Sequence, residues 1–270
     1  MTSSADFDYS TIALSLTDGI ARLRLNRPDA ANAINGHLAA ELFDAATRLR
    51  WDPSVRTVLI GANGRVFCGG GDVAEFGSIG DSLPAHVARV THDLHGALQA
   101  FAAMDAPVVI AVGGSAGGAG LSLVSAGDLV IAGSQAKFTM AYTRVGLTPD
   151  GSSSFYLARA IGLRRAMDLV LTNRVLTAQE AESWGLVNRV VDNSELEDAA
   201  EELAGTLAAG PTAAFGASKR LFVRGATSDL ADALARESEE ISRMSATADA
   251  REAISAFLGK REPRFGQHLT

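Results

Sequence analysis

Apolar and polar residues alternate along two short runs near the start of the chain, TIALSLT and IARLRLN. The runs flank Asp18-Gly19, a dipeptide typical of a two-residue turn. Because a strand presents successive side chains to opposite faces of a sheet, this alternation indicates strands with one buried face. The segment 11–26 therefore predicts a β-hairpin.

Helical and strand patterns then follow one another. From Asn35 the spacing of Leu38 and Leu42 predicts a helix capped by Asn35, and the run VRTVLIGA predicts a buried strand. A helical pattern over about 85–103 precedes the strand runs PVVIAV and DLVIAG, and further helical segments come after them. Strands that recur between helices predict an α/β fold.

The last part of the chain is dominated by helical patterns. Thr177 and Glu180 form a capping box that opens a helix, and the run LVNRVV is the last predicted strand. The helical pattern that follows has breaks near Pro211 and Gly225. Its apolar positions exceed what one core needs, so we expect it to pack against the core or against another subunit. The predicted regions are a core over 1–194 and a helical region over 195–270.

Composition narrows the classes of function. The chain has 270 residues, 47% of them hydrophobic, and a formal net charge of −7. Such a chain can bury a large core, and its negative charge makes nucleic acid a poor partner. The start lacks the pattern of a signal or transit peptide, and no apolar run is long enough to span a membrane. We therefore expect a cytoplasmic protein with neither a nucleic-acid nor a membrane partner.

Sulfur and imidazole groups are sparse. Cys68 is the only cysteine, so an intrachain disulfide is excluded, and we expect it to be a small buried hydrophobe rather than a nucleophile. His86, His92 and His95 fall on one predicted helix without a neighbouring cluster of cysteines or carboxylates. We expect their side chains to face solvent and no metal site to form.

Two glycine-rich loops are candidates for binding negative charge. RVFCGGGDVAEF follows one predicted strand, and AVGGSAGGAG lies between another strand and a helix. Backbone N–H groups in such loops can form an oxyanion hole, although the glycines are equally compatible with tight turns. Neither loop has the spacing of a dinucleotide fingerprint or a P-loop.

The second loop also matches G-x-S-x-G, the nucleophile elbow of α/β-hydrolases, with Ser115 as the nucleophile. The only histidine after it is His268, two residues from the end. A base there is difficult to hold within reach of Ser115, so a serine hydrolase remains a remote alternative.

One carboxylate, Asp150, lies in GLTPDGSSSF between a proline and a run of small residues. It is either a cap for the helix that follows or a catalytic acid/base. Ser152, Ser153 and Ser154 can themselves cap that helix, which weakens the first interpretation.

Six segments, in this order, resemble the enoyl-CoA hydratase/isomerase, or crotonase, family. They are NRPDAANAIN, FCGGGDVAEF, AVGGSAGGAGLSL, VGLTPDGSSS, LTAQEAESWGLVNRVV and AFLGKREPRF. The resemblance implies a spiral of stacked ββα units and a C-terminal helical region that forms trimers, often paired into hexamers. It also implies an acyl-CoA thioester as substrate, with coenzyme A as part of the substrate and no separate cofactor.

The resemblance assigns roles to particular residues. Gly71 and Ala119 match the family's two N–H donors to the thioester oxygen. The residues that match substrate-binding positions are Gly69, Asp72, Val73, Tyr142, Phe257 and Lys260. A lysine frequent in the family's first loop is replaced here by Ala74, which removes one expected phosphate contact.

Two departures from the family pattern decide the expected reaction. The two glutamates that hydratases use fall on Ser122 and Tyr142, neither of which acts as a carboxylate base. Asp150 occupies the place of the acid residue in isomerase members, both those that move a 3-enoyl double bond to 2-enoyl and those resembling the phenylacetate-pathway ring-opening isomerase. We therefore expect an acyl-CoA isomerase with Asp150 as acid/base. The alternative is an acyl-CoA-binding relative with weak or no hydratase activity.

Overall fold

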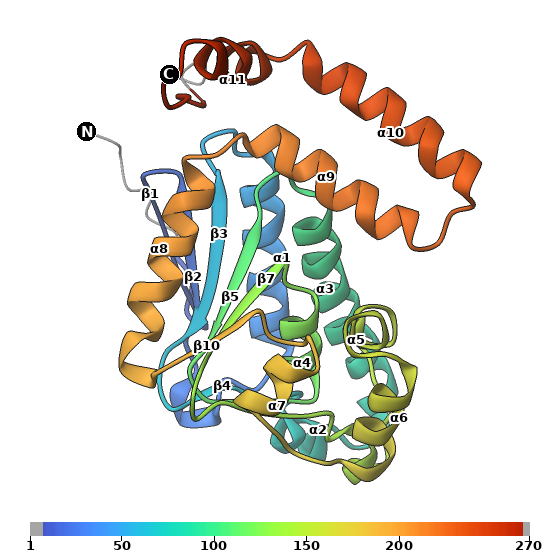
Figure 1. Cartoon of the computed structure of the whole chain (residues 1–270). Coiled ribbons are helices and arrows are strands. Elements are labelled where there is room, and N and C mark those ends of the chain that lie inside the picture. Colours follow the sequence, from blue (N-terminus) through green and yellow to red (C-terminus); the bar gives the residue numbers. More distant parts are fainter. Residues whose placement is uncertain (1–7, 267–270) are drawn as a thin grey trace.

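Six strands form the larger of the two sheets found among the described residues. The computed structural model describes residues 8–266 (Figure 1). In spatial order the strands are β1 (Ile12–Thr17), β2 (Ile20–Leu25), β3 (Thr57–Ala62), β5 (Val108–Val112), β7 (Leu129–Gly133) and β10 (Arg189–Val191). The first pair is antiparallel and the others are parallel. Asp18 and Gly19 both have positive φ, 53° and 77°, as a type I′ turn requires, so the predicted hairpin is confirmed.

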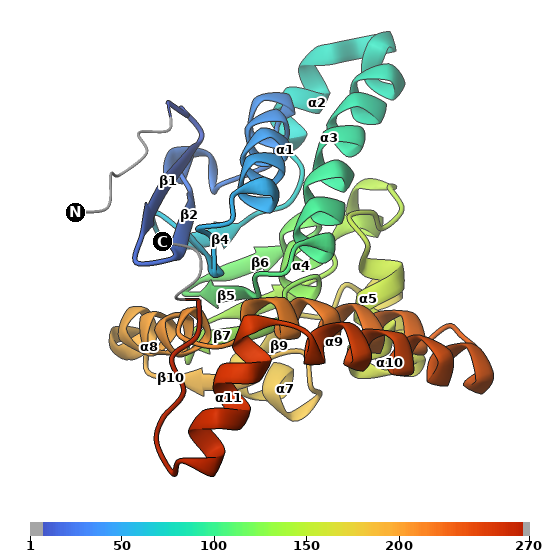
Figure 2. The same ribbon diagram turned by 90° about the horizontal axis from the view of Figure 1, so that it is seen from above.

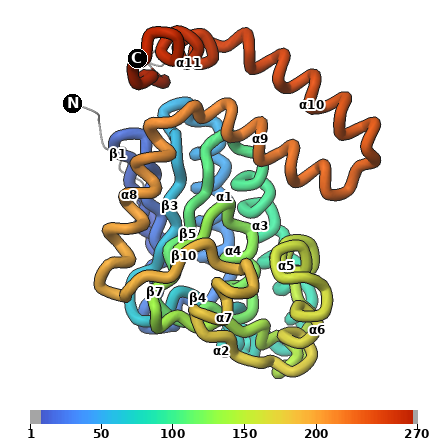
Figure 3. Tube along the Cα trace, viewed as in Figure 1, coloured from blue at the N-terminus to red at the C-terminus, as the bar shows by residue number. Residues whose placement is uncertain are grey.

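A second, smaller sheet was not predicted. Its strands, in order, are β4 (Val66–Cys68), β6 (Ser115–Gly117), β8 (Lys137–Thr139) and β9 (Leu176–Thr177). Strands of two or three residues, some of them in the glycine loops, are too short to show a period of alternation. Three strands of the large sheet are each followed by a strand of the small sheet and then by a helix; they are β3, β5 and β7. This repetition produces the expected spiral of ββα units, whose path Figure 3 traces.

Seven α-helices of the described residues accompany this spiral. They are α1 (Gly36–Trp51), α2 (Val73–Ile79), α3 (Leu83–Ala103), α4 (Ala119–Ser125), α5 (Ser153–Ile161), α6 (Leu163–Thr172) and α7 (Ala178–Ser183). Asn35 caps α1 by accepting a hydrogen bond from Leu38 N at 2.9 Å. Thr177 and Glu180 form the capping box of α7. Both capping predictions are therefore confirmed.

Helix α8 (Leu196–Ala208) covers one face of the large sheet, where small residues such as Ala200 and Ala204 are fully buried. Two ion pairs fasten it to β2, Arg22–Glu201 at 2.7 Å and Arg24–Glu197 at 2.8 Å. The opposite face packs against α1, α3 and the small sheet in the main core. The first helix of the predicted C-terminal region thus packs on the large sheet of the spiral, in a second hydrophobic cluster.

The last three helices are α9 (Thr212–Gly225), α10 (Leu230–Ser245) and α11 (Ala248–Leu258). The predicted breaks near Pro211 and Gly225 are confirmed. In Figures 1 and 2, α10 and α11 lie outside the body of the spiral. Leu234, Ile241 and Phe257 are 54%, 72% and 84% exposed. Within 8–266, none of the helices is both long and apolar enough to cross a membrane.

Candidate active site

A cavity of about 350 Å³ lies between the two glycine loops, α3 and the segment 141–150. The sequence-predicted site residues that line it are Gly69, Gly71, Val73, Ala119, Tyr142 and Asp150. Apolar side chains of α3, including Val90 and Leu94, line it as well. Val145 and Leu147 also line it and are 51% and 40% exposed. An apolar cavity with few polar groups is typical of a small-molecule site.

The parallel pair β4 and β6 brings the two glycine loops together. Gly70 has a φ of 108°, and a Cβ there would lie 3.0 Å from the carbonyl oxygen of Gly117. A Cβ at Gly120 would lie 2.4 Å from the carbonyl oxygen of Cys68. The glycines therefore allow one loop backbone to approach the other closely. They also leave backbone exposed in the cavity.

Gly71 and Ala119 each present a backbone N–H without a protein acceptor among residues 8–266. The neighbours of Gly71 are paired with Ile34, whose N–H donates to Gly70 and whose carbonyl accepts from Asp72. Ala119 is the first residue of α4, where a helix N–H has no partner inside the helix. Both residues line the same cavity, so the two free donors are compatible with the oxyanion hole that the family resemblance implies.

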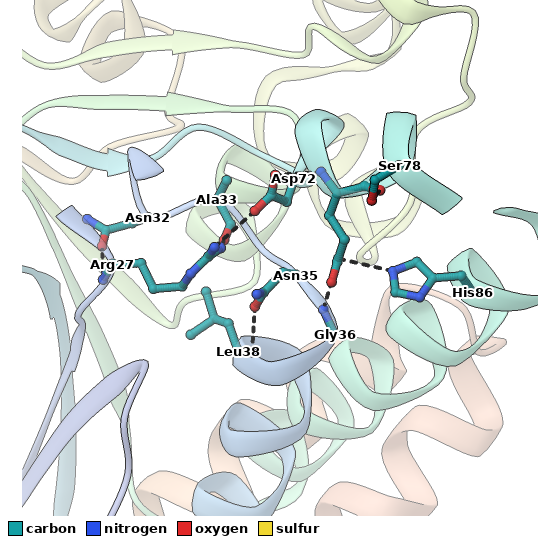
Figure 4. Close-up of polar contacts among 10 residues, drawn as sticks. Arg27, Asn32, Ala33, Asn35, Gly36, Leu38, Asp72, Ser78 and His86 are labelled. Carbon is teal, nitrogen blue, oxygen red and sulfur yellow. Dashed lines mark hydrogen bonds and ion pairs between the residues drawn. The ribbon is translucent and has the colours of Figure 1, made fainter. Parts of the chain in front are cut away.

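Asp72, in contrast, does not line this cavity. Its Oδ1 caps α2 by accepting from Glu75 N at 3.1 Å, and its Oδ2 lies 3.0 Å from Nη2 of Arg27. The Arg27 guanidinium also donates to the carbonyl of Ala33, as Figure 4 shows. This network fastens the segment 27–35 to the first glycine loop. Asp72 thus supports the loop from outside the cavity.

Ser122, Tyr142 and Asp150 form a chain of hydrogen bonds. The Tyr142 phenol donates to Oδ1 of Asp150, and Oγ of Ser122 lies 3.0 Å from the phenol oxygen. Burial raises the pKa of Tyr142, and the negative charge of Asp150 raises it further. The phenol therefore remains a donor at neutral pH. Of the two positions that match the hydratase glutamates, Tyr142 thus contacts the carboxylate directly, and Ser122 contacts Tyr142.

The side chain of Asp150 does not cap α5. Its backbone carbonyl accepts from the N–H and the hydroxyl of Ser153, at 3.3 and 2.9 Å. The N-cap residue, Ser152, has a φ of 67° and makes no side-chain cap bond. Its hydroxyl is buried without a partner in the part of the chain that the structure describes. The expected serine cap is therefore wrong, because the left-handed backbone of Ser152 carries its side chain away from the helix N–H groups.

The expected exposure to solvent is confirmed for His92, whose side chain is 75% exposed, and holds in part for His95, whose side chain is 43% exposed. His86 is buried, with Nε2 3.0 Å from Oε2 of Glu75. His95 accepts a hydrogen bond from Gly151 N at 3.1 Å, and its Nε2 lies 3.6 Å from Oδ2 of Asp150. Sequence reasoning missed this contact because it joins segments 56 residues apart.

Phe257 and Lys260 are not brought to the cavity within one chain. Phe257 lies on α11 and is 84% exposed, and Lys260 follows the end of that helix. In Figures 1 and 2, α11 and α2, which borders the cavity, lie at opposite ends of the molecule. The chain by itself therefore places these two residues outside the site.

Ser115 lies in strand β6 and lines a different cavity, of about 510 Å³. A nucleophile elbow is a sharp turn from strand to helix, whereas Ser115 has extended backbone four residues before α4 begins. No histidine is among the described residues that line this second cavity. His268 lies outside the described residues. The geometry gives the serine-hydrolase interpretation no support.

Comparison with known proteins shows which family and which solved structures this chain resembles. Residues 15–268 match the family described as Enoyl-CoA hydratase/isomerase. A probable enoyl-CoA hydratase of Rhodobacter capsulatus is 37% identical, over 95% of this chain and 98% of that protein. The 1,2-epoxyphenylacetyl-CoA isomerase of Escherichia coli is 36% identical, over 92% and 95%. The crystal structure of a putative enoyl-CoA hydratase/isomerase from Mycobacterium abscessus has a TM-score of 0.90 at 40% identity, covering 94% of this chain and 99% of that one.

Proposed function

This chain belongs to the enoyl-CoA hydratase/isomerase family, and we propose that it is an acyl-CoA isomerase that uses Asp150 as its acid/base. The observation that most directly supports this proposal is that Asp150 is the one carboxylate among the described residues that line the cavity. Hydration of a double bond needs proton transfers to both carbon and oxygen, which one carboxylate serves poorly. Isomerisation needs one group that removes a proton and returns it elsewhere.

The proposed reaction begins when Asp150 removes a proton from the carbon next to the thioester carbonyl. The electron pair of the broken C–H bond moves into an enolate, whose oxygen accepts hydrogen bonds from the N–H groups of Gly71 and Ala119. Each such donor is worth roughly 3 to 4 kcal/mol of barrier. Asp150 then returns a proton to the distal carbon, which moves the double bond. Tyr142 holds Oδ1 throughout, so Oδ2 is the oxygen that carries the proton.

The other parts of the substrate are assigned to parts of the site by their chemical character. The apolar part of the cavity, with Val145 and Leu147 exposed beside it, takes the acyl group. Backbone at Gly69 and Val73 lines the path toward coenzyme A. Phe257 and Lys260 reach the coenzyme only from another subunit, which requires a homotrimer or hexamer built through the exposed apolar side chains of α10 and α11.

The test is conversion of a 3-enoyl-CoA to its 2-enoyl isomer by the wild type and by Asp150→Asn. We expect turnover to fall roughly 10²- to 10⁴-fold in the variant, because the neutral amide cannot accept the proton. Asp168→Asn, an exposed aspartate on α6, is the matched control and should keep wild-type turnover. Isomerisation by Asp150→Asn at the wild-type rate would show that another group moves the proton.

The relatives' names include both hydratases and isomerases, so hydration is assayed in parallel. A wild type that hydrates 2-enoyl-CoA faster than it isomerises 3-enoyl-CoA contradicts the proposal. Tight binding of acyl-CoA without turnover of either substrate supports the alternative, an acyl-CoA-binding relative with weak or no activity.

A further inference from the structure

The side chain of His95 lies between the active-site cavity and a separate depression on the outer surface of the molecule. The depression has a volume of about 500 Å³ and is lined by side chains of α1 and α3, His95 among them. Its lining shares no residue with that of the cavity, although Leu94, the residue before His95, lines the cavity. The side chain of His95 is 43% exposed and that of Asp150 is 25% exposed. The pair therefore spans the wall between the two spaces.

The hydrogen bonds of His95 specify which ring nitrogen faces Asp150. Nε2 accepts from Gly151 N at 3.1 Å, so in the neutral ring this nitrogen carries a lone pair and the proton is on Nδ1. The same Nε2 lies 3.6 Å from Oδ2 of Asp150. A movement of about half an ångström brings the two atoms to hydrogen-bond distance, and such contacts commonly shorten when substrate binds.

The Tyr142 phenol donates to Oδ1 of Asp150, which leaves Oδ2 facing His95. The other charged or titratable side chains that line the depression are Arg50 of α1 and His92 of α3. His92 has its Nδ1 3.0 Å from Oδ1 of Asp93, and Arg50 lies over the ring of Trp51. His95 is thus the one group of the described depression that contacts Asp150.

We propose that His95 is a proton relay that connects Asp150 to solvent. The inference rests on the proposed function, because Asp150 must first take a proton from the substrate. Nε2 first gives up its hydrogen bond from Gly151 N. The O–H bond on Oδ2 then breaks and an N–H bond forms on Nε2, while the proton on Nδ1 leaves to water in the depression. Asp150 becomes a carboxylate again and the ring stays neutral. The reverse steps deliver a solvent proton to Asp150, which transfers it to the distal carbon.

The test follows deuterium from solvent into the product. In D₂O at low conversion, the wild type should form 2-enoyl-CoA that carries deuterium at the distal carbon. His95→Gln keeps an acceptor for Gly151 N but cannot relay a proton, so deuterium content should fall by about threefold or more. His92→Gln, one turn earlier and in the same depression, is the matched control and should match the wild type. Thermal unfolding checks that all three proteins fold.

A second measurement separates the relay from the isomerase. A saturated acyl-CoA has no double bond to move, but its proton next to the thioester carbonyl exchanges with D₂O whenever the enolate forms. If the saturated acyl-CoA exchanges its proton in a way that depends on His95, but 3-enoyl-CoA is not isomerised, the relay is supported and the isomerase proposal is contradicted. If the wild type and His95→Gln both isomerise 3-enoyl-CoA and their products contain equal amounts of deuterium, the isomerase proposal is supported and the relay is overturned. Absence of both exchange and isomerisation overturns both.

Discussion

The Tyr142 phenol donates its hydrogen bond to Oδ1 of Asp150, and Oγ of Ser122 lies 3.0 Å from the same phenol oxygen. A tyrosine and a serine thus stand at positions that match the glutamates of hydratases, and they hold a carboxylate in place. Tyr142→Phe keeps the ring and removes this donor. A hydrogen bond to a charged group contributes roughly 1.5–3 kcal/mol, so we expect kcat to fall about ten- to a hundredfold.

The matched control is Tyr156→Phe, a half-buried tyrosine on α5 that does not line the cavity. Steady-state kinetics of the two variants on 3-enoyl-CoA separate the two positions. Equal rates for both would mean that Tyr142 does not orient Asp150.

The N–H of Ala119 can be removed with little change to the helix. Ala119 is the first residue of α4, a position where proline is tolerated because its N–H lacks a helical partner. We expect Ala119→Pro to fold and to lose roughly 10²- to 10³-fold in kcat, because the enolate oxygen loses one donor. Ala248→Pro makes the same change at the first residue of α11 and should keep its kcat. Full activity of Ala119→Pro would remove this residue from the oxyanion hole.

Gly151, beside Asp150, has no room for a side chain. Its φ is 59°, and a Cβ there would lie 2.8 Å from Cβ of Ser122. Gly146 has a similar φ of 72° but open space around it. Gly146→Ala should therefore cost only the backbone strain, about 1–2 kcal/mol, whereas Gly151→Ala should cost about 1–3 kcal/mol more.

Urea unfolding of the two glycine variants measures the difference. Adding Ser122→Gly to Gly151→Ala removes the overlapping Cβ and should recover part of the loss. Equal unfolding free energies for the two single variants would contradict the steric explanation.

Glu41 makes the stability of the hairpin edge depend on pH. Although burial opposes its charge, hydrogen bonds from Ser10, Thr11 and His37 lower the pKa of Glu41 from 4.5 to about 2. A carboxylate with a lowered folded-state pKa stabilises the fold fully above its unfolded pKa. That contribution is lost as the pH falls from about 4.5 toward 2.

We therefore expect Glu41→Gln to unfold at lower urea than the wild type near neutral pH, with the difference shrinking as the pH falls below 4.5. Glu239→Gln, on the exposed surface of α10, provides the control. A difference between Glu41→Gln and the wild type that stays constant down to about pH 3 would rule out this linkage.

Cys68 lies fully buried behind the first glycine loop, and burial raises the pKa of its thiol to about 12. Because the thiolate is the reactive form, we expect a thiol reagent to label the native protein very slowly at pH 8 and to label it rapidly in denaturant. Rapid labelling of the native state would mean that the loop opens.

Local chemistry made much of the fold predictable. The Asp18-Gly19 turn, the Asn35 cap and the Thr177–Glu180 capping box each depend on residues a few positions apart, and each was confirmed. The small sheet was not predicted because its strands are two or three residues long. Their pairing depends on neighbouring turns of the spiral rather than on their own sequence.

The sequence by itself determined the strands of the large sheet, most of the helices, the family resemblance and the set of residues worth inspecting, because periodicity, capping and motifs are carried by neighbouring positions. Only the tertiary structure decided that Tyr142 and His95 both contact Asp150, that His86 is buried, and that Asp72 lies outside the cavity. The contact of His95 with the segment of Asp150 joins positions 56 residues apart, and the contact between Tyr142 and Asp150, eight residues apart, depends on how the irregular segment between them folds. They exist only where packing of the sheets and helices brings those segments together.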